Sequence, residues 1–512
     1  MRVTRSRIRF EPDELEGIAT IDVLFDGRLI WSVPAARVKP SGLTWPRALR
    51  PYLKGRTEIS VRDSADEREI GRSEVRFGWG SGRIDFRDQA GRPLAMTKWN
   101  RLGPVLDGES SGIRDRLLVN AAAIVETLEQ HGFTTYIVGG SLLGAVRDGG
   151  LMPHDDDIDL AFLADSSDPA DIALASYRME HLLKDAGYVV VRHSLAHLEI
   201  DFFSPSGHVE HYVDVFTGFF RDGLYCQPFA LRGPEVVPED LVPVQRIEIE
   251  GVSLPAPANP EAWLSYAYGP DWRIPDPSFV FETSQWTRRR FEGSFGVYNR
   301  ARVYWEKRYL GRDGRPDPVN ADADLDRFLE SIPPNSNVLD LGCGSGETSS
   351  VIAAAGHRVV GVDFSHEALA IARSSTDGVR FHYLNLNDRS ALLGFGLALV
   401  GSGERWYVHS RDVIHGLTRT NRKNVFTFLR LVLRGGAFAY FTTYTDFCRE
   451  YRRGDPTSWH YPEDWILEES EGFGVTYRKV AAHRAATEHG RRNRLVFELR
   501  SADDVGHDEG TA

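Results

Sequence analysis

The first hundred residues alternate apolar and polar side chains in short stretches. Examples are ATIDVLF (19–25), GRLIWSV (27–33), TEISVRD (57–63) and SEVRFGW (73–79). A period of two is typical of strands with one buried face, and turns rich in Gly, Pro and Asp separate these stretches. The pattern predicts a small β-rich accessory domain over residues 1–102, folded as a sandwich or barrel.

Four tryptophans of this region would form a sugar-stacking surface if they were exposed, although core packing is the more common use of such side chains. They are Trp31, Trp45, Trp79 and Trp99.

A second pattern runs from residue 136 to residue 162. Residues 136–138 form an apolar strand-like run, residues 139–141 (Gly-Gly-Ser) form a turn, and residues 142–147 have the pattern of the first turns of a helix. After a turn at Pro153, residues 158–162 are predicted to form another strand. Glycines and a helix start expose backbone N–H groups that can meet a phosphate.

Two carboxylates lie at the start of this second strand. Asp157 and Asp159 are two residues apart and so project to one face, whereas Asp156 points the other way. Paired carboxylates suit Mg²⁺ or Mn²⁺, which prefer oxygen ligands shared with substrate phosphates. Arg147 would neutralise phosphate charge. The pattern predicts a phosphoryl-transfer site, with a solvated acidic turn as the alternative.

These motifs resemble the LicD/fukutin family of phosphotransferases, within the nucleotidyltransferase superfamily. The resemblance is carried by GSLLGAVR (140–147) and DDDID (155–159), and continues through YVDVF (212–216) and YGPDW (268–272). It covers roughly residues 113–277 and implies that Asp214 is the third carboxylate, either as a metal ligand or as acceptor of the proton from the attacking hydroxyl. Asp201, in LEIDFF, is the rival for that place.

The resemblance further implies an activity. A cytidine-diphosphate-activated donor carrying choline, glycerol, ribitol or a similar alcohol would give its substituted phosphate to a hydroxyl of a glycan or lipid-linked glycan. Two alternatives remain open here: nucleotidyl transfer to a small molecule, and a non-catalytic glycan-binding or scaffolding protein. The residues implied for metal binding and catalysis are Asp157, Asp159 and Asp214; those implied for the donor phosphates are Gly139, Gly140, Ser141 and Arg147.

A third pattern starts at residue 337 and reads as strand, glycine loop, helix, strand, acidic residue and helix. The strand ends in DLGCGSG, and an acid about 20 residues later is placed to hold the two ribose hydroxyls of a cofactor. NAD and S-adenosylmethionine both fit this unit, but the acid ahead of the glycines resembles motif I of class I methyltransferases. That resemblance spans roughly residues 298–500 and implies S-adenosylmethionine as cofactor, bound by Asp340, Gly342, Gly344, Gly346, Asp363 and Asn385.

Asn385 stands where the family usually has an acid near the adenine, which is a departure from its pattern. His409 and His415 lie where methyl acceptors usually dock, although a structural role is the more common one for such histidines. Cys343, inside the glycine loop, is expected to be a packing residue because no base is spaced to activate it.

The chain is therefore predicted to be a multidomain α/β and α+β protein. Residues 1–102 form the accessory domain, 103–277 a nucleotidyltransferase-like α+β domain, and 278–336 a helical connector with the first methyltransferase helices. Residues 337–500 form a Rossmann-like methyltransferase core, and 501–512 a disordered tail. A 512-residue chain has room for three or more such units.

Composition narrows the environment. The chain is 42% hydrophobic and 26% charged with mean hydropathy −0.33, and its apolar runs fall short of a membrane span. A net charge of −12 argues against nucleic-acid binding, and three scattered cysteines argue against a disulfide framework. We expect a cytoplasmic protein without nucleic-acid partners, with peripheral contact at the inner face of the membrane as an alternative. Its two activities would serve one pathway of cell-surface glycan modification, with activity of the methyltransferase alone as a further alternative.

Overall fold

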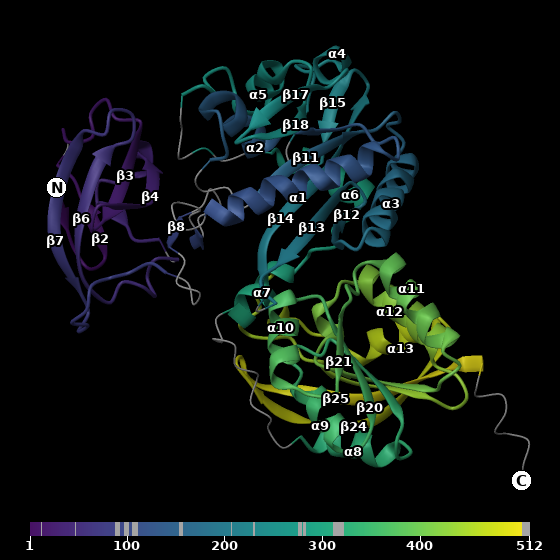
Figure 1. Ribbon diagram of the computed structural model, residues 1–512. Helices are drawn as coiled ribbons and strands as arrows, with labels where there is room; N and C mark the ends of the chain where they lie inside the picture. Colours follow the sequence, from purple (N-terminus) through teal and green to yellow (C-terminus); the bar gives the residue numbers. More distant parts are fainter. Residues whose placement is uncertain are drawn as a thin grey trace, which may run out of the picture. The chain divides into compact units, whose positions relative to one another are not determined.

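The computed structural model describes residues 1–11, 13–46, 48–87, 93–96, 102–104, 111–152, 157–205, 207–228, 231–274, 279, 283–310 and 322–503 (Figure 1). The chain forms two compact units. One comprises Met1–Phe202 with Glu210–Gly296, and the other comprises Phe203–Val209 with Val297–Ala512. Each unit is described by itself below.

The N-terminal part of the first unit is β-rich, as its alternating pattern predicts. A three-stranded antiparallel sheet has the order β1 (Arg2–Val3), β2 (Arg7–Arg9), β5 (Leu43–Thr44). A four-stranded antiparallel sheet has the order β4 (Arg28–Pro34), β3 (Thr20–Phe25), β6 (Gly55–Asp63), β7 (Glu69–Phe77). A short pair, β8 (Leu94–Met96) and β9 (Leu102–Pro104), is also present. Ile8 and Leu43 of the smaller sheet share one hydrophobic core with Val23 and Val61 of the larger.

Two of the four tryptophans of this region are core residues. Trp31 and Trp45 are buried in this core, where Trp45 packs edge-on against Phe77. Trp79 is 96% exposed, and Trp99 lies outside the described residues. Trp31 and Trp45 are thus core residues, the more common use of such side chains, and cannot belong to a sugar-stacking surface.

A mixed seven-stranded sheet forms the centre of the rest of the first unit. Its main path is β10 (Thr135–Ile137), β11 (Asp157–Leu163), β14 (Val209–Arg221), β13 (His197–Phe203), β12 (Val189–Ser194). Strands β15 (Leu224–Gln227) and β16 (Leu231–Gly233) extend it from β14. Strands β11 and β14 run parallel, so equivalent ends of these two strands lie side by side.

Helices α1 (Ser111–Glu129) and α3 (Pro169–Asp185) contribute to the core on one side of this sheet. Ile158 and Leu160 of β11 are buried in the same core as Leu117 of α1 and Met179 of α3. The intervening positions of β11, Asp157 and Asp159, therefore face the other side. The remaining elements of this unit are α2 (Gly139–Leu143), the π-helical turn η3 (Gly144–Asp148), α4 (Pro238–Leu241), β17 (Gln245–Ile249), β18 (Val252–Ala256), α5 (Pro260–Tyr268) and α6 (Gln285–Phe295).

The helix after β10 differs from its sequence prediction. It begins at Gly139, whereas the pattern placed residues 139–141 in a turn and the helix at 142–147. Gly139 enters this helix with φ of 59°, and Val138, the residue before it, is extended. A glycine therefore makes the change from strand to helix within one residue.

The second unit contains a seven-stranded sheet of the order β21-β20-β19-β22-β23-β25-β24. Strands β19 (Asn337–Leu341), β20 (Arg358–Asp363), β21 (Arg380–Tyr383), β22 (Trp406–Arg411) and β23 (Phe438–Tyr444) are parallel, and β24 (Val475–Thr487) and β25 (Gly490–Ser501) form an antiparallel edge. The chain order reverses at β19, between β20 and β22. In such Rossmann-like sheets ligands bind at the carboxyl ends of the strands beside this reversal.

Helices connect the strands of this sheet. They are α7 (Arg302–Leu310), α8 (Ala323–Ser331), α9 (Glu347–Ala354), α10 (His366–Ser375), α11 (Arg389–Gly401), α12 (Arg419–Val432) and α13 (Glu463–Glu471), with short 3-10 turns η4 (Ile414–Gly416) and η5 (Pro456–Ser458). The range 278–336, predicted to be a connector, contains α6, α7 and α8, while residues 311–321 and 504–512 lie outside the described part. No helix in the described ranges is long and apolar enough to cross a membrane.

Candidate active sites

Three carboxylates predicted from the sequence meet on one face of the first unit's central sheet. Asp159 of β11 lies directly opposite Asp214 of the parallel strand β14, and Asp157 lies opposite Tyr212. One oxygen each of Asp157, Asp159 and Asp214 lies within 4.8 Å of the other two. Because side chains alternate between the two faces of each strand, β11 and β14 bring Asp159 and Asp214 together although they are 55 positions apart in the sequence.

Local contacts hold Asp157 and Asp159 in place. The backbone N–H of Asp159 donates to Ser141 Oγ at 3.0 Å, so α2 is tied to the start of β11. Tyr212 Oη donates to Asp157 Oδ2 at 3.3 Å. Gly139 and Gly140 lie at the start of α2, beside β11, and Ser141 and Gly140 are buried. Pro153 to Asp156, including His154, lies outside the described residues.

Asp214, and not Asp201, completes the group. Asp201 is a buried residue of β13, but among the described residues the acidic group comprises Asp157, Asp159 and Asp214. Burial raises the pKa of Asp214 well above its ordinary value, and the charge of Glu199 raises it further, as do those of Asp157 and Asp201. Several negative charges thus lie close together, an arrangement that cations stabilise.

Arg147 lies on η3, the turn that directly follows α2. Its guanidinium forms two hydrogen bonds of 2.8 Å to the Asp148 carboxylate and is 15% exposed. A neighbouring carboxylate therefore already offsets its charge. Its contact with a donor phosphate stays a prediction.

The sequence analysis missed a set of polar residues on the same sheet face. His197 Nε2 lies 2.8 Å from Asp214 Oδ1, and His193 Nε2 lies 3.0 Å from Glu199 Oε2. The alternation in HLEID (197–201) would have placed His197, Glu199 and Asp201 on one face. What it could not show is that this face is the one that carries Asp214.

The second unit has a cavity of about 330 Å³ at the carboxyl ends of β19, β20 and β22. The predicted cofactor residues lining it are Asp340, Gly342, Gly344, Asp363 and Asn385. Gly346 is the N-cap of α9, and a Cβ there would lie 3.0 Å from the Cβ of Ala372 on α10. A Cβ on Gly344 would come within 2.5 Å of Tyr309 Oη, and the residue has φ of 55°, so another side chain there would displace Tyr309 and strain the backbone.

Asp363, at the end of β20, is positioned by backbone amides. Its Oδ2 accepts from the N–H of Gly344 at 3.0 Å, and its Oδ1 accepts from the N–H of Ser365 at 2.9 Å. Burial raises the pKa of Asp363 to about 6, while these backbone hydrogen bonds oppose the increase. A carboxylate oxygen accepts more than one hydrogen bond, so both oxygens retain capacity for ribose hydroxyls.

Of the other residues predicted for this region, some line the cavity and others are buried in the core. Asn385 lines the cavity and donates to the carbonyl of Tyr298. His409 is buried, with its Nδ1 3.3 Å from Asp340 Oδ1 and its ring packed against Phe328. His415 lines the cavity, and burial lowers its pKa to about 4, so its imidazole is neutral at pH 7. Burial also raises the pKa of the Cys343 thiol well above its ordinary value, as expected for a packing residue.

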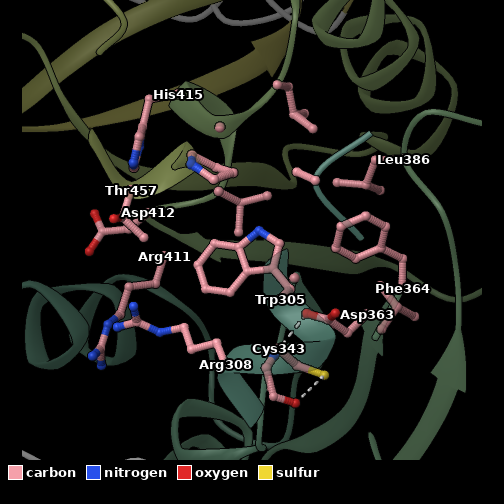
Figure 2. Close-up of a pocket in the computed structure, with 18 of the residues that line it drawn as sticks. Trp305, Arg308, Cys343, Asp363, Phe364, Leu386, Arg411, Asp412, His415 and Thr457 are labelled. Carbon is pink, nitrogen blue, oxygen red and sulfur yellow. Dashed lines mark hydrogen bonds between the residues drawn. The ribbon is translucent and has the colours of Figure 1, made fainter. Parts of the chain in front are cut away.

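Helix α7 contributes cavity residues that the sequence analysis did not identify. Trp305 lies between Asp363 on one side and Asp412 and His415 on the other (Figure 2). Glu306 accepts hydrogen bonds from Ser365 Oγ, His366 N and Glu367 N, at 2.7, 3.0 and 3.1 Å. This carboxylate therefore ties α7 to the first turn of α10. The aromatic spacing of the connector predicted a helix but carried no signal of this long-range contact.

Asp412 is the second cavity residue that was missed. It follows β22 with φ of 58°, an unusual conformation for a residue other than glycine. Thr442 Oγ1 donates to its Oδ1 at 2.9 Å, and Arg494 donates to its Oδ2 at 3.2 Å. Although burial opposes it, the charge of Arg494 helps to lower the pKa of Asp412 below its ordinary value. The cavity thus presents an ionised carboxylate beside a neutral imidazole.

Comparisons with known proteins match the two units separately. The model of the LicD/FKTN/FKRP nucleotidyltransferase domain matches residues 132–259, and a methyltransferase-domain model matches residues 314–478. The chain is 32% identical over 111 residues to an uncharacterized methyltransferase of Synechocystis sp., which is 21% of this chain and 48% of that protein. The chain thus spans about half the length of this curated relative.

Solved structures of methyltransferases were also found among the similar proteins. A SAM-dependent methyltransferase from Anabaena variabilis is 15% identical, with a TM-score of 0.33, over 40% of this chain and 94% of that one. Magnesium protoporphyrin IX methyltransferase from Synechocystis, with bound SAM, is 16% identical, with a TM-score of 0.29, over 39% and 95%. From the two matched models, the chain joins a LicD/FKTN/FKRP-type nucleotidyltransferase domain to a methyltransferase domain in one polypeptide.

Proposed function

We propose that this chain is a bifunctional enzyme that transfers a substituted phosphate to a sugar hydroxyl and methylates a product of the same pathway. The donor is a cytidine-diphosphate-activated alcohol of the choline, glycerol or ribitol type. The acceptor is a cell-surface glycan or its lipid-linked precursor, modified in the cytoplasm or at the inner face of the membrane.

One observation carries the first activity: Asp157, Asp159 and Asp214 converge from two parallel strands. Their oxygens, within 4.8 Å of one another, fit Mg²⁺ or Mn²⁺, which takes carboxylate ligands together with substrate phosphates. When bound, such an ion supplies charge neutralisation for the phosphoryl group. The donor phosphates would be bound by the backbone amides of Gly139 and Gly140, by Ser141 and by Arg147.

The transfer forms one bond and breaks one bond. The acceptor oxygen bonds to the phosphorus that carries the alcohol, and the bond from that phosphorus to the bridging oxygen breaks, so that CMP leaves. Asp214 would either complete the ligand set or accept the hydroxyl proton.

The second activity depends on the cavity around Asp363. The cavity is also lined by Gly342, Gly344 and Asn385, and this lining suits the ribose and adenine of S-adenosylmethionine. This cofactor supplies a methyl group on a sulfonium. Asp363 would hold the ribose hydroxyls, and Asp412 and His415 would contact the methyl acceptor from the opposite side of Trp305.

The leaving group tests the first activity. The purified chain, given Mg²⁺, a CDP-alcohol and sugar acceptors, should release CMP and form a phosphodiester. Asp157→Asn should not do so. Release of pyrophosphate from a nucleoside triphosphate instead would identify a nucleotidyltransferase, and full CMP release by Asp157→Asn would contradict the assignment of the site.

A further inference from the structure

The strand pair β12–β13 contains a bulge at His193. Arg192 pairs with Leu198 and Ser194 pairs with His197, so His193 is the extra residue between them. A bulge changes the direction of a side chain. Here Arg192 is directed to Glu180 and Ser176 of α3, while His193 stacks on His197 with ring centroids 4.5 Å apart and a 19° angle.

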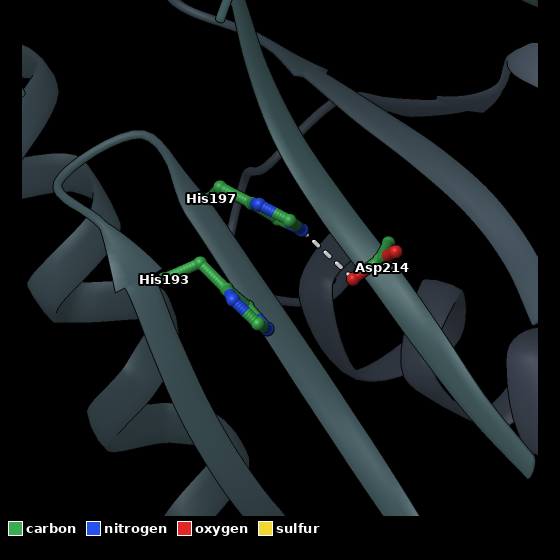
Figure 3. A group of neighbouring side chains, drawn as sticks. All are labelled: His193, His197 and Asp214. Carbon is green, nitrogen blue, oxygen red and sulfur yellow. Dashed lines mark hydrogen bonds and ion pairs between the residues drawn. The ribbon is translucent and has the colours of Figure 1, made fainter. Parts of the chain in front are cut away.

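The two imidazoles lie beside the acidic group. His193 and His197 project from neighbouring strands in parallel planes, and His197 reaches Asp214 (Figure 3). One nitrogen of each histidine and one oxygen of Asp214 lie within 4.8 Å of one another. Phe216 stacks under His197 at 4.3 Å, and Glu199 lies 3.0 Å from His193. The side chains of His193, His197 and Asp214 are 11%, 14% and 11% exposed.

These distances suit a metal ion. Ligand atoms about 2.0–2.2 Å from a zinc ion lie at most about 4.4 Å apart, so small rotations of the three side chains would bring them into range. Two imidazoles and a carboxylate favour a borderline transition ion such as Zn²⁺ or Co²⁺ over Mg²⁺, which prefers oxygen. Such a ligand set is chemically different from Asp157, Asp159 and Asp214.

We propose that His193, His197 and Asp214 form a second cation site that takes a Zn²⁺-class ion, with Asp214 shared between it and the carboxylate site. Glu199 is placed to act as a further ligand or to orient His193. Two ions would then offset the negative charge on this sheet face, which comes from Asp157, Asp159, Glu199, Asp201 and Asp214. A role in catalysis rests on the proposed phosphotransferase function, whereas binding of the ion does not.

Co²⁺ provides a direct test because imidazole ligands give its visible spectrum a characteristic form. The full-length chain, freed of affinity-tag histidines, is titrated with Co²⁺ and, separately, with Zn²⁺ by calorimetry. We expect one ion with nitrogen ligands in the wild type, and at least a tenfold loss of affinity in both His193→Asn and His197→Asn. Asp157→Asn should keep the nitrogen-ligated ion. His181→Asn is the matched control, because His181 is exposed on α3 and bonded to the Tyr177 carbonyl.

Three outcomes would overturn the proposal. Unchanged Zn²⁺ affinity in both histidine variants would show that the imidazoles only orient Asp214 through hydrogen bonding. Loss of the Co²⁺ spectrum in Asp157→Asn would show a single site. Equal loss in His181→Asn would show nonspecific binding. If the Co²⁺ site behaves as expected while CMP release fails, the proposed function is wrong and the metal site stands.

Discussion

The carboxylate of Asp159 lies so close to Gly139 that a Cβ on Gly139 would be 2.1 Å from Asp159 Oδ2. No side chain other than hydrogen fits there without moving the carboxylate. The first residue of the glycine motif and the last residue of the acidic motif are thus two parts of one steric arrangement.

Gly139→Ala should therefore reduce phosphate transfer by at least about 100-fold, a loss typical of one displaced transition-state contact. Gly132→Ala is the control. Gly132 also has positive φ, 82°, but a Cβ there meets nothing within 4 Å. Both variants carry a backbone cost of about 1–2 kcal/mol. Transfer assays alongside thermal unfolding would contradict this account if the two variants lost activity equally.

The three carboxylates should be individually necessary. Asp157→Asn, Asp159→Asn and Asp214→Asn each remove an anionic ligand at constant size, and we expect transfer rates about 10²–10³-fold lower with folding preserved. Asp201→Asn should leave transfer largely intact, because the acidic group in the described structure contains Asp214 and not Asp201. Rates at saturating Mg²⁺ check this, and a reversed order for Asp201 and Asp214 would reassign the third carboxylate.

S-adenosylmethionine, and not NAD, should stabilise the chain against heat. A ligand at 100 times its Kd adds about 2.7 kcal/mol to the free energy of unfolding of the domain it binds. Asp363→Ala should abolish this effect, since its carboxylate is the predicted acceptor for the ribose hydroxyls. Equal stabilisation by NAD would contradict the methyltransferase interpretation.

The same residue predicts a pH dependence. Burial raises the pKa of Asp363 to about 6, and the ionised carboxylate is the form that would accept hydrogen bonds from the ribose hydroxyls. Affinity for S-adenosylmethionine should therefore be constant above about pH 7 and fall as pH decreases through 6, by up to about tenfold per unit. Calorimetric titration between pH 5 and pH 8 measures this. Asp363→Asn, which does not titrate, should show a flat profile, and a wild-type profile as flat as the variant's would be contrary evidence.

His409 and His415 should differ in their effects. His409→Leu breaks a buried contact with Asp340 and should cost about 1–3 kcal/mol of stability. His415→Leu should slow methyl transfer by about 10²-fold while leaving the Kd of S-adenosylmethionine within a factor of two, because His415 lines the cavity and its proposed role is contact with the methyl acceptor. Its pKa of about 4 means that it stays neutral between pH 6 and 8. A stability loss in His415→Leu as large as in His409→Leu would argue for a structural role in both.

Strand alternation was sufficient to predict the shared face of Asp157 and Asp159, because Ile158 between them and Leu160 after them are both fully buried. Alternation could not predict His193, since a bulge adds one residue and the register of β12 against β13 is not visible in one strand. Alternation also could not show which face of β4 packs against the core, so it did not predict whether Trp31 is buried or exposed. Glu306 and Asp412 depend on long-range packing and on an unusual φ, neither of which leaves a local pattern.

We propose that the two sites of this chain act on one glycan. Tethering raises the effective concentration of one site's product at the other to about millimolar, which helps only if they share a substrate. Mass spectrometry of the acceptor after incubation with CDP-alcohol, Mg²⁺ and S-adenosylmethionine tests this most directly. The wild type should add both a phosphate-linked group and a methyl group. Asp363→Ala should add only the phosphate-linked group. Asp157→Asn should add both groups more slowly than the wild type. Methylation of the native acceptor at full rate by Asp157→Asn, without phosphate transfer, would contradict the account and show that the domains act independently.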